Sequence, residues 1–402
     1  MLIKYYKLII GVSLLILINW LIILASNIYL SFNEVYILEQ DTYSFYNNNY
    51  LYLIIFYLYF FYIAYIFFRI NVKTITTIIY KNSIYPHKNL NKILIVFVVA
   101  LLSIAYLNLA LSDLPPLLKG GYINRIGYLE ETRLWSILKP FGAVLVIVPI
   151  ILGYLNGHHF IYKKTNIFLY IILFIYIFYL LLIGQKFSGI LQAFFYFYLP
   201  IIIYYILYNK NFFNKKIVSQ ILIFGTLMIF WLAYHYSNNP LSEKVGGAFQ
   251  FLIYRIFALQ GHLSWGFYNY KDLLNFEPSF VIHGMQNMMR TVGGPGVESM
   301  IERGVNFAGA FPTLYIMSFP IGINFLVIGL IYYLYLYLII KIIKNLDKIY
   351  YIFYIYIFNY IRTFFSRASI EELFNFKIIG LLFMILFVML LTNKYIKLKE
   401  NG

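Results

Sequence analysis

The sequence predicts an all-α protein built as a polytopic bundle of membrane-spanning helices. Hydrophobic residues make up 62% of the 402 residues and charged residues only 11%, far outside the range of soluble globular proteins. The apolar residues gather in runs long enough to cross a bilayer, which takes about 17–25 residues. Lysine is concentrated in the short segments between these runs, as expected of loops that set orientation. We therefore expect residues 1–402 to form a single integral membrane domain.

The apolar runs predict about ten membrane spans, and about nine to twelve are compatible with the pattern. The first run follows Lys4 and Lys7; it is too long for the apolar part of a signal peptide and lacks a small-residue cleavage site. The fourth, ninth and tenth runs are shorter than a full span. The runs are Leu8–Leu30, Leu51–Phe68, Ile93–Ser112, Phe141–Leu155, Ile167–Ile183, Phe187–Tyr208, Ile217–Tyr234, Ile321–Ile340, Ile349–Ile361 and Ile378–Thr392.

Placing the N-terminus in the cytoplasm sorts the charged residues without conflict. The cytoplasmic segments then hold 17 lysines, Arg69 and two acidic residues, so they carry the whole net charge of +16. The outer segments hold six lysines, seven arginines and 13 acidic residues, and are neutral overall. This asymmetry follows the positive-inside rule and predicts that both termini are cytoplasmic. It also removes the reason to expect nucleic acid as a partner.

Three outer segments are more than simple turns. Residues 113–140 form a first extracytoplasmic loop with adjacent prolines and a stretch of mixed charge. Residues 184–189 form a tight reversal around Lys186. Residues 236–320 form the large extracytoplasmic loop and carry ten of the 24 glycines; a long loop of this kind is usually functional or disordered, and its aromatic residues argue against disorder. Within it, the pattern of residues 248–263 predicts an interfacial helix with Arg255 and His262 on one face.

Arginine on the outer face predicts a phosphate or diphosphate site. The guanidinium group offers a planar fork of donors that matches phosphate in a bidentate way, whereas lysine offers a point charge. Arg255, Arg290 and Arg303 lead because they share the large loop with glycine turns. For each of them, pairing with an outer carboxylate or a lipid headgroup is the alternative. The seven outer arginines are Arg125, Arg133, Arg255, Arg290, Arg303, Arg362 and Arg367.

A general base must come from the histidines and carboxylates of the large loop, where His235, His262, His283, Asp272, Glu298 and Glu302 are the candidates. His283 and Glu298 rank first because they flank Arg290 and the glycine cluster at 293–296. The chain has no cysteine, the adjacent His158 and His159 point in different directions, and no nucleotide-binding motif is present. We therefore expect extracytoplasmic chemistry without a metal, a nucleotide or another cofactor.

This layout resembles the O-antigen and capsule repeat-unit polymerases, the Wzy-type family, over most of the chain. Residues 184–189, Gly-Gln-Lys-Phe-Ser-Gly, are similar to the family's Gly/Ser-Arg-Gly reversal, with Lys186 in place of the arginine. Residues 308–315, Ala-Gly-Ala-Phe-Pro-Thr-Leu-Tyr, followed by Gly322, are similar to the family's helix start after the large loop. Pro320 departs from the continuous helix expected there.

The resemblance implies a GT-C-like glycosyltransferase of the bacterial inner membrane that joins undecaprenyl-diphosphate-linked repeat units into O-antigen or capsule. It implies Arg255, Arg290 and Arg303 as diphosphate ligands, Arg125 and Lys186 as helpers, and His283 or Glu298 as the catalytic base. Membrane lipids, a chain-length regulator and a flippase are the implied partners. An O-antigen ligase would share the leaving group. A flippase or transporter predicts repeat-related halves and charged residues within the spans, and a structural envelope protein is a further alternative.

Overall fold

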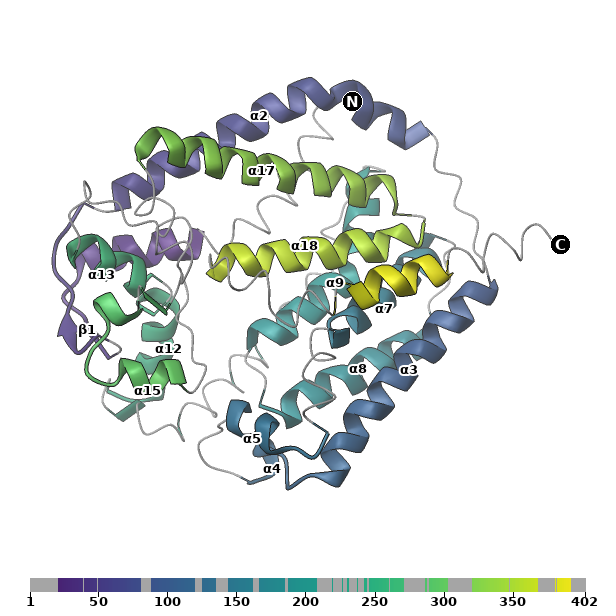
Figure 1. The fold of residues 1–402 in the computed structure, drawn as a ribbon, viewed down its shortest axis with the longest axis horizontal. Helices are drawn as coiled ribbons and strands as arrows, with labels where there is room; N and C mark the ends of the chain where they lie inside the picture. The colour runs from purple at the N-terminus through teal and green to yellow at the C-terminus, as the bar shows by residue number, and fades with distance from the viewer. Residues whose placement is uncertain are drawn as a thin grey trace.

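The computed structural model describes residues 21–38, 40–48, 50–80, 88–119, 125–134, 144–161, 166–184, 187–207, 246–259, 261–270, 286–287, 289–302, 320–346, 348–367 and 382–391, with a few single positions between 219 and 243 and at 380. This part of the chain is mostly helical (Figure 1). Its one hairpin pairs β1 (Tyr36–Ile37) with β2 (Thr42–Tyr43) in antiparallel register. The labelled helices are α2 (Tyr50–Tyr80), α3 (Lys88–Leu111), α4 (Pro116–Lys119), α5 (Arg125–Glu131), α7 (Ile147–Ile161), α8 (Ile167–Leu182), α9 (Phe187–Leu207), α12 (Ala248–Phe257), α13 (His262–Tyr270), α15 (Val297–Glu302), α17 (Ile321–Lys344) and α18 (Tyr350–Arg367).

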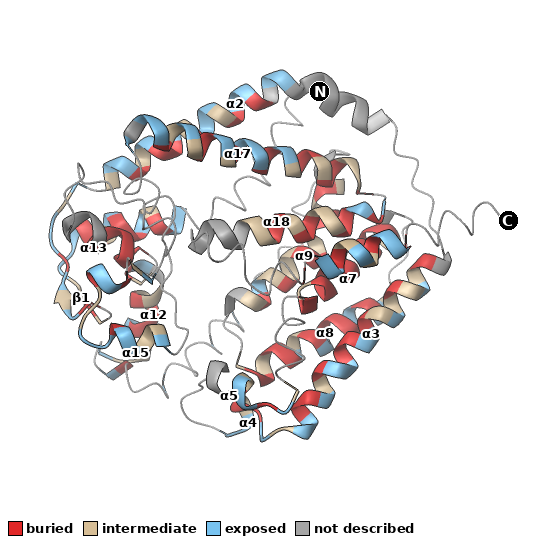
Figure 2. Cartoon of the chain, viewed as in Figure 1, coloured by how far each residue is buried: buried red, intermediate tan, exposed pale blue. Residues whose placement is uncertain are grey.

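Within the described residues, three helices are long and apolar enough to cross a membrane: Tyr50–Phe67, Leu90–Lys119 and Gly322–Lys344. Shorter apolar helices lie at Leu21–Phe32, Ile167–Leu182, Gly189–Tyr204 and Leu382–Leu391. Large apolar side chains cover the outside of the bundle as well as its core, and Figure 2 shows exposed residues along α2, α3 and α17. Such a surface suits lipid rather than water. The prediction of a mostly helical fold is confirmed, and the apolar helices are consistent with a membrane-embedded protein.

Helix α7 lies at the centre of the bundle, and its residues 147–157 are all buried. Its close neighbour is α9, which runs parallel to it. A Cβ added at Gly153 would lie 2.1 Å from the carbonyl oxygen of Tyr196, and one added at Gly157 would lie 2.6 Å from the Cβ of Pro200. Two glycines one turn apart therefore let the backbones of α7 and α9 approach closely, as small residues do between helices in lipid.

A hydrogen-bonded group of polar side chains joins α9 to α18 inside the bundle. The Tyr196 hydroxyl donates to Oδ1 of Asn359 over 2.7 Å, and the Gln192 amide donates to the same oxygen. Tyr196 and Asn359 are both buried. Because unsatisfied polar groups are costly in an apolar interior, these mutual bonds fix how the two helices sit against each other.

Helices α2 and α17 also pack parallel, along one edge of the bundle (Figure 1). The rings of Phe56 and Phe325 stack with centroids 4.9 Å apart, and the Tyr59 hydroxyl donates to the Phe325 carbonyl. Pro320 stands just before the first residue of α17, where its missing N–H costs no helical hydrogen bond. Both helices therefore begin at the same end of the bundle. Helix α18 follows turns at residues 345–346 and 348–349.

A small unit sits where α2 and α17 begin, and we call it the hairpin module. It consists of the helix Leu21–Phe32 and the β1–β2 hairpin packed against α12, α13 and α15 (Figure 1). Its small apolar core contains Leu30, Ile37, Phe251, Tyr254, Ala258 and Trp265. The two chain segments are also joined by hydrogen bonds: the Ser26 hydroxyl donates to the Ala258 carbonyl over 2.9 Å and accepts from the Gly261 N–H over 2.8 Å.

Several helices differ from their predicted bounds. Helix α2 continues to Tyr80 rather than ending at Phe68, and α18 continues to Arg367 rather than ending at Ile361. The single helix predicted over 248–263 is divided into α12 and α13, because the chain turns at 258–261 around Ser26; a Cβ at Gly261 would lie 2.7 Å from that side chain. The fourth predicted span, Phe141–Leu155, corresponds to α7 at Ile147–Ile161. Helix α7 continues through buried Asn156 and His158, since its central position lets the bundle cover polar residues. The seventh predicted span, Ile217–Tyr234, lies almost wholly outside the described residues.

Candidate functional site

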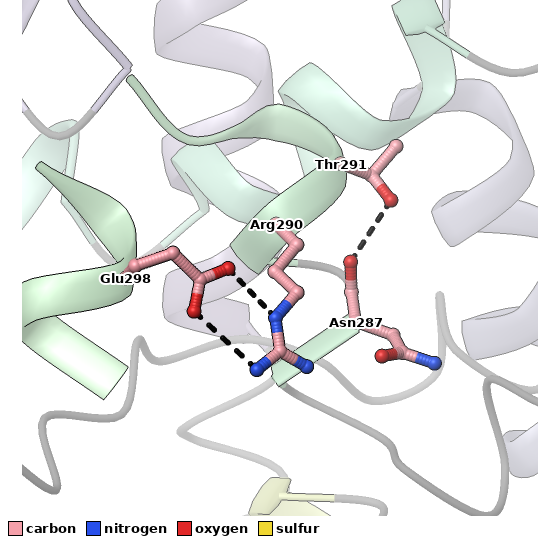
Figure 3. A network of polar contacts seen from close by, with 4 residues as sticks. All are labelled: Asn287, Arg290, Thr291 and Glu298. Carbon is pink, nitrogen blue, oxygen red and sulfur yellow. Dashed lines mark hydrogen bonds and ion pairs between the residues drawn. The ribbon is translucent and has the colours of Figure 1, made fainter. Parts of the chain in front are cut away.

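An ion pair between Arg290 and Glu298 marks the exposed side of the hairpin module. Nε of Arg290 donates to Oε1 of Glu298 over 2.8 Å, and Nη2 donates to Oε2 over 3.4 Å (Figure 3). The guanidinium fork thus faces both oxygens of one carboxylate, the geometry in which it also binds phosphate. The structure therefore brings together one predicted diphosphate ligand and one predicted base.

A glycine turn brings these two side chains together. Gly293 follows the helical residues 289–292, and a Cβ there would lie 1.9 Å from the Val297 side chain and 2.5 Å from the Met289 carbonyl oxygen. The chain then reverses, and α15 begins at Val297. Met289, Val292 and Val297 are buried beneath the turn, which leaves Arg290 and Glu298 on its outer side. The buried apolar side chains hold the turn, and the charged ones face outward.

Both partners of the ion pair are open to solvent, with 46% of the Arg290 side chain and 62% of the Glu298 side chain exposed. The Glu298 carboxylate raises the pKa of the Arg290 guanidinium above its ordinary value by accepting its hydrogen bonds. Arg290 is therefore a permanent cation at this place. Exposed ion pairs contribute little net stability, because solvent screens them and long side chains lose freedom. An incoming anion can consequently exchange with the carboxylate.

Arg255 lies in the same module, on α12, and its Cζ is 5.6 Å from the centre of the Phe251 ring. This cation–π contact directs the guanidinium along the helix that packs against the hairpin. His262 is fully buried at the start of α13, where Nδ1 lies 2.7 Å from the Leu259 carbonyl oxygen. The two residues stand on different helices, so the single face predicted to carry both is not present.

The other predicted site residues are placed less fully. His283, Arg303 and Lys186 lie outside the described residues. Arg125 begins α5, whose backbone is described but whose Arg125 side chain is not. Helix α5 stands beside α4, at a distance from the hairpin module (Figure 1). The first loop folds against the end of α3, where the Leu134 N–H donates to Asn108 Oδ1 over 3.1 Å.

The hairpin at residues 36–43 is a part of the site that we did not predict. Its turn is clamped to the large loop at two points. The Gln40 side-chain amide donates to the His262 carbonyl over 2.9 Å, and a Cβ added at Gly294 would lie 3.2 Å from the Cβ of Asp41. Two short runs, Val35–Leu38 and Thr42–Tyr43, separated by the polar residues 39–41, are the sequence signal of this hairpin.

Among the residues that the structure describes, no group of three or more His, Asp or Glu side chains is arranged to hold a metal ion.

Residues 280–388 match a family of unknown function, DUF6418. The matched range starts shortly before Arg290 and ends in the helix Leu382–Leu391, so it includes the Arg290–Glu298 pair together with α15, α17 and α18. The hairpin, α12 and α13 lie outside it. None of the curated proteins and none of the solved structures matches the chain.

Proposed function

We propose that this protein polymerises lipid-diphosphate-linked oligosaccharide repeat units into a surface polysaccharide, on the outer face of the bacterial inner membrane. In this proposal the chain has about ten spans arranged in a GT-C-like manner, with both termini in the cytoplasm. Undecaprenyl diphosphate carries the growing glycan, and the hairpin module faces the compartment in which the repeat units are joined.

The observation that carries the proposal is the exposed fork of Arg290, held at the surface of the hairpin module by a carboxylate. Such a fork is matched to a phosphate group in shape and charge. The module lies where α2 and α17 begin, beside helices long enough to span a membrane. A diphosphate on a membrane lipid would be presented at this level, because its isoprenoid tail stays in the bilayer.

The reaction assigns a separate task to each member of the ion pair. The hydroxyl oxygen of the acceptor repeat attacks the anomeric carbon of the donor glycan, while the bond from that carbon to the diphosphate oxygen breaks. The lipid diphosphate leaves with the bonding electrons, and Arg290 stabilises its charge. The hydroxyl proton passes to a carboxylate, and Glu298 is the described carboxylate next to Arg290.

The Arg290–Glu298 ion pair links diphosphate stabilisation to proton acceptance. While Glu298 accepts from Arg290, its oxygens are engaged and it is a poor base for a hydroxyl. A diphosphate that takes over the guanidinium fork releases the carboxylate beside the reacting carbon. Donor binding thereby prepares the base, and the two steps occur in a fixed order.

The proposal is tested by deleting the gene and separating the surface glycan on a gel. Loss of the long ladder, with a single repeat unit still attached to its carrier, is the result expected of a polymerase. Complete loss of attached glycan would point to a ligase or a flippase and would overturn the proposal. Complementation with Arg290→Gln should reproduce the deletion at normal protein level. Lys119→Gln, which removes a cation from the exposed Lys119–Asp113 pair at 3.8 Å, should restore the ladder.

A further inference from the structure

The exposed face of the β1–β2 hairpin carries two tyrosine rings side by side. Tyr36 and Tyr43 are directly paired across the strands, with ring centroids 5.1 Å apart and planes inclined by 54°. The opposite face of the hairpin carries Ile37, which is buried in the core of the hairpin module. One face therefore anchors the hairpin, and the other presents aromatic surface, with 57% of Tyr43 exposed.

A carboxylate stands next to this aromatic pair. Asp41 closes the hairpin turn with φ of 53°, in the left-handed region that aspartate tolerates, and its Oδ1 accepts a hydrogen bond from the Tyr36 hydroxyl. This bond raises the pKa of the Tyr36 hydroxyl above its ordinary value, so the group remains a neutral donor. Asp41 is exposed, and its second oxygen is available to accept from a bound molecule.

From these contacts we propose that Tyr36, Tyr43 and Asp41 form a saccharide-binding platform. A pyranose ring has one face of C–H groups, which packs on an aromatic ring, and a rim of hydroxyl groups, which donate to a carboxylate. The platform offers both: a broad tyrosine surface and an acidic acceptor at its edge. A lipid headgroup surface is a poorer match, because the Asp41 carboxylate would be repelled by anionic phosphates.

The platform is fixed to the loop that carries the ion pair. Asp41 touches Gly294, which belongs to the turn between Arg290 and Glu298. Gln40, the neighbour of Asp41, is buried and bound to the start of α13. The hairpin therefore holds its aromatic face in a set position next to the proposed diphosphate site. This assignment rests on the proposed function, in which the platform binds sugars of the repeat unit.

The test uses the full chain in lipid nanodiscs and saturation-transfer difference NMR. The probes are the methyl glycosides of glucose, galactose, mannose, rhamnose, N-acetylglucosamine and N-acetylgalactosamine. At least one glycoside should receive saturation through its C–H face, and Tyr43→Ala should reduce that transfer about fivefold or more. Tyr46→Ala is the matched control: Tyr46 is at least as exposed as Tyr43 and lies on the same segment, but its ring contacts Phe32 and not the Tyr36–Tyr43 pair.

Three outcomes would overturn the platform. The first is no transfer to any of the six glycosides, and the second is an equal loss of transfer in Tyr46→Ala. The third is quenching of the added tryptophan in Tyr43→Trp by brominated lipids, which would place that side chain in the bilayer. Calorimetry with inorganic pyrophosphate on the same proteins separates the two proposals. Pyrophosphate binding should be lost in Arg290→Gln and unchanged in Tyr43→Ala. Absence of pyrophosphate binding in the unaltered protein counts against the diphosphate site and leaves the platform standing.

Discussion

Asp41 lies against Gly294, although one residue is near the start of the chain and the other is in its last third: a Cβ added at Gly294 would be 3.2 Å from the Cβ of Asp41. The contact joins the β1–β2 turn to the glycine turn between Arg290 and Glu298. A side chain at position 294 would require these turns to move apart by a few tenths of an ångström. The smallest residue therefore permits the hairpin to rest directly on the candidate site.

A disulfide between these positions tests that contact. Disulfides form when the two Cβ atoms are about 3.5–4.5 Å apart, so a small shift brings positions 41 and 294 into range. Because the chain has no cysteine, the double variant Asp41→Cys with Gly294→Cys contains only the two thiols under test. Under mild oxidation we expect it to lose both thiols to alkylation, as measured by intact mass. Asp41→Cys with Gly296→Cys is the control, since nothing lies within 4 Å of a Cβ at Gly296. Equal cross-linking of both pairs would refute the contact.

Competition between Glu298 and a bound anion can be measured directly. Glu298→Gln removes the charge that competes for the Arg290 fork, so pyrophosphate should bind more tightly, by about threefold or more, in calorimetry. Polymer synthesis should nevertheless fall, because the base is gone. Asp113→Asn alters the exposed Lys119–Asp113 ion pair and should change neither quantity. Weaker pyrophosphate binding in Glu298→Gln would show that the carboxylate supports the anion site rather than competing for it.

The side of the membrane occupied by the hairpin module is open to labelling in whole cells. Tyr46 and Ser299 are exposed in the module, and Lys348 is exposed in the turn between α17 and α18. Single cysteines at positions 46 and 299 should react together with a membrane-impermeant maleimide. A cysteine at 348 should react only after the cells are permeabilised. Different labelling of positions 46 and 299 would contradict the packing of these two segments in one module. If both positions react only after permeabilisation, the proposed extracytoplasmic location of the module is contradicted.

Several features of this fold follow from the sequence because they depend on local pattern. The uninterrupted apolar run Ile167–Ile183 corresponds to α8 within one residue at its end, and the apolar run Ile321–Ile340 begins at the same residue as α17. The shifted bounds of α7 have a tertiary cause. Asn156 and His158 are polar, but neighbouring helices bury both residues, and hydropathy along the chain carries no information about such cover.

The candidate site was partly foreseeable. Arg290 and Glu298 stand out because both flank the glycine cluster, yet their separation of eight residues is not the three or four at which side chains on one helix make contact. Only the reversal at Gly293 brings them into contact, and a turn of that kind depends on the buried Met289 and Val297 beneath it. The hairpin escaped prediction because each strand has two residues, too few for an alternating pattern to stand out.

Because α7 and α9 approach closely, one methyl group added between them should reduce the stability of the protein strongly. In Gly153→Ala the new Cβ would meet the Tyr196 carbonyl oxygen at 2.1 Å, so the helices must separate, at a cost of about 1–3 kcal/mol or more. Gly322→Ala is the matched control in another apolar helix; nothing lies within 4 Å of the new Cβ, and the change should be neutral or stabilise by about 0.5–1 kcal/mol. Thermal midpoints from fluorescence-detected size exclusion compare the two. Equal midpoints would contradict the packing.

Asn359 is the shared acceptor of the polar group between α9 and α18. Substitution of Asn359 should therefore reduce stability more than substitution of either donor. Asn359→Leu leaves the buried Tyr196 hydroxyl and the Gln192 amide without that acceptor, and should destabilise the protein by about 1–3 kcal/mol. Tyr196→Phe removes one donor while the Gln192 bond to Asn359 remains, and should cost about 0.5–1.5 kcal/mol. The double variant, Tyr196→Phe with Asn359→Leu, isolates the energy of the Tyr196–Asn359 bond. It leaves only the Gln192 amide without this acceptor, whereas Asn359→Leu alone also leaves the Tyr196 hydroxyl without it. If the double variant is less stable than the two single changes added together, the three side chains do not act as one hydrogen-bonded group.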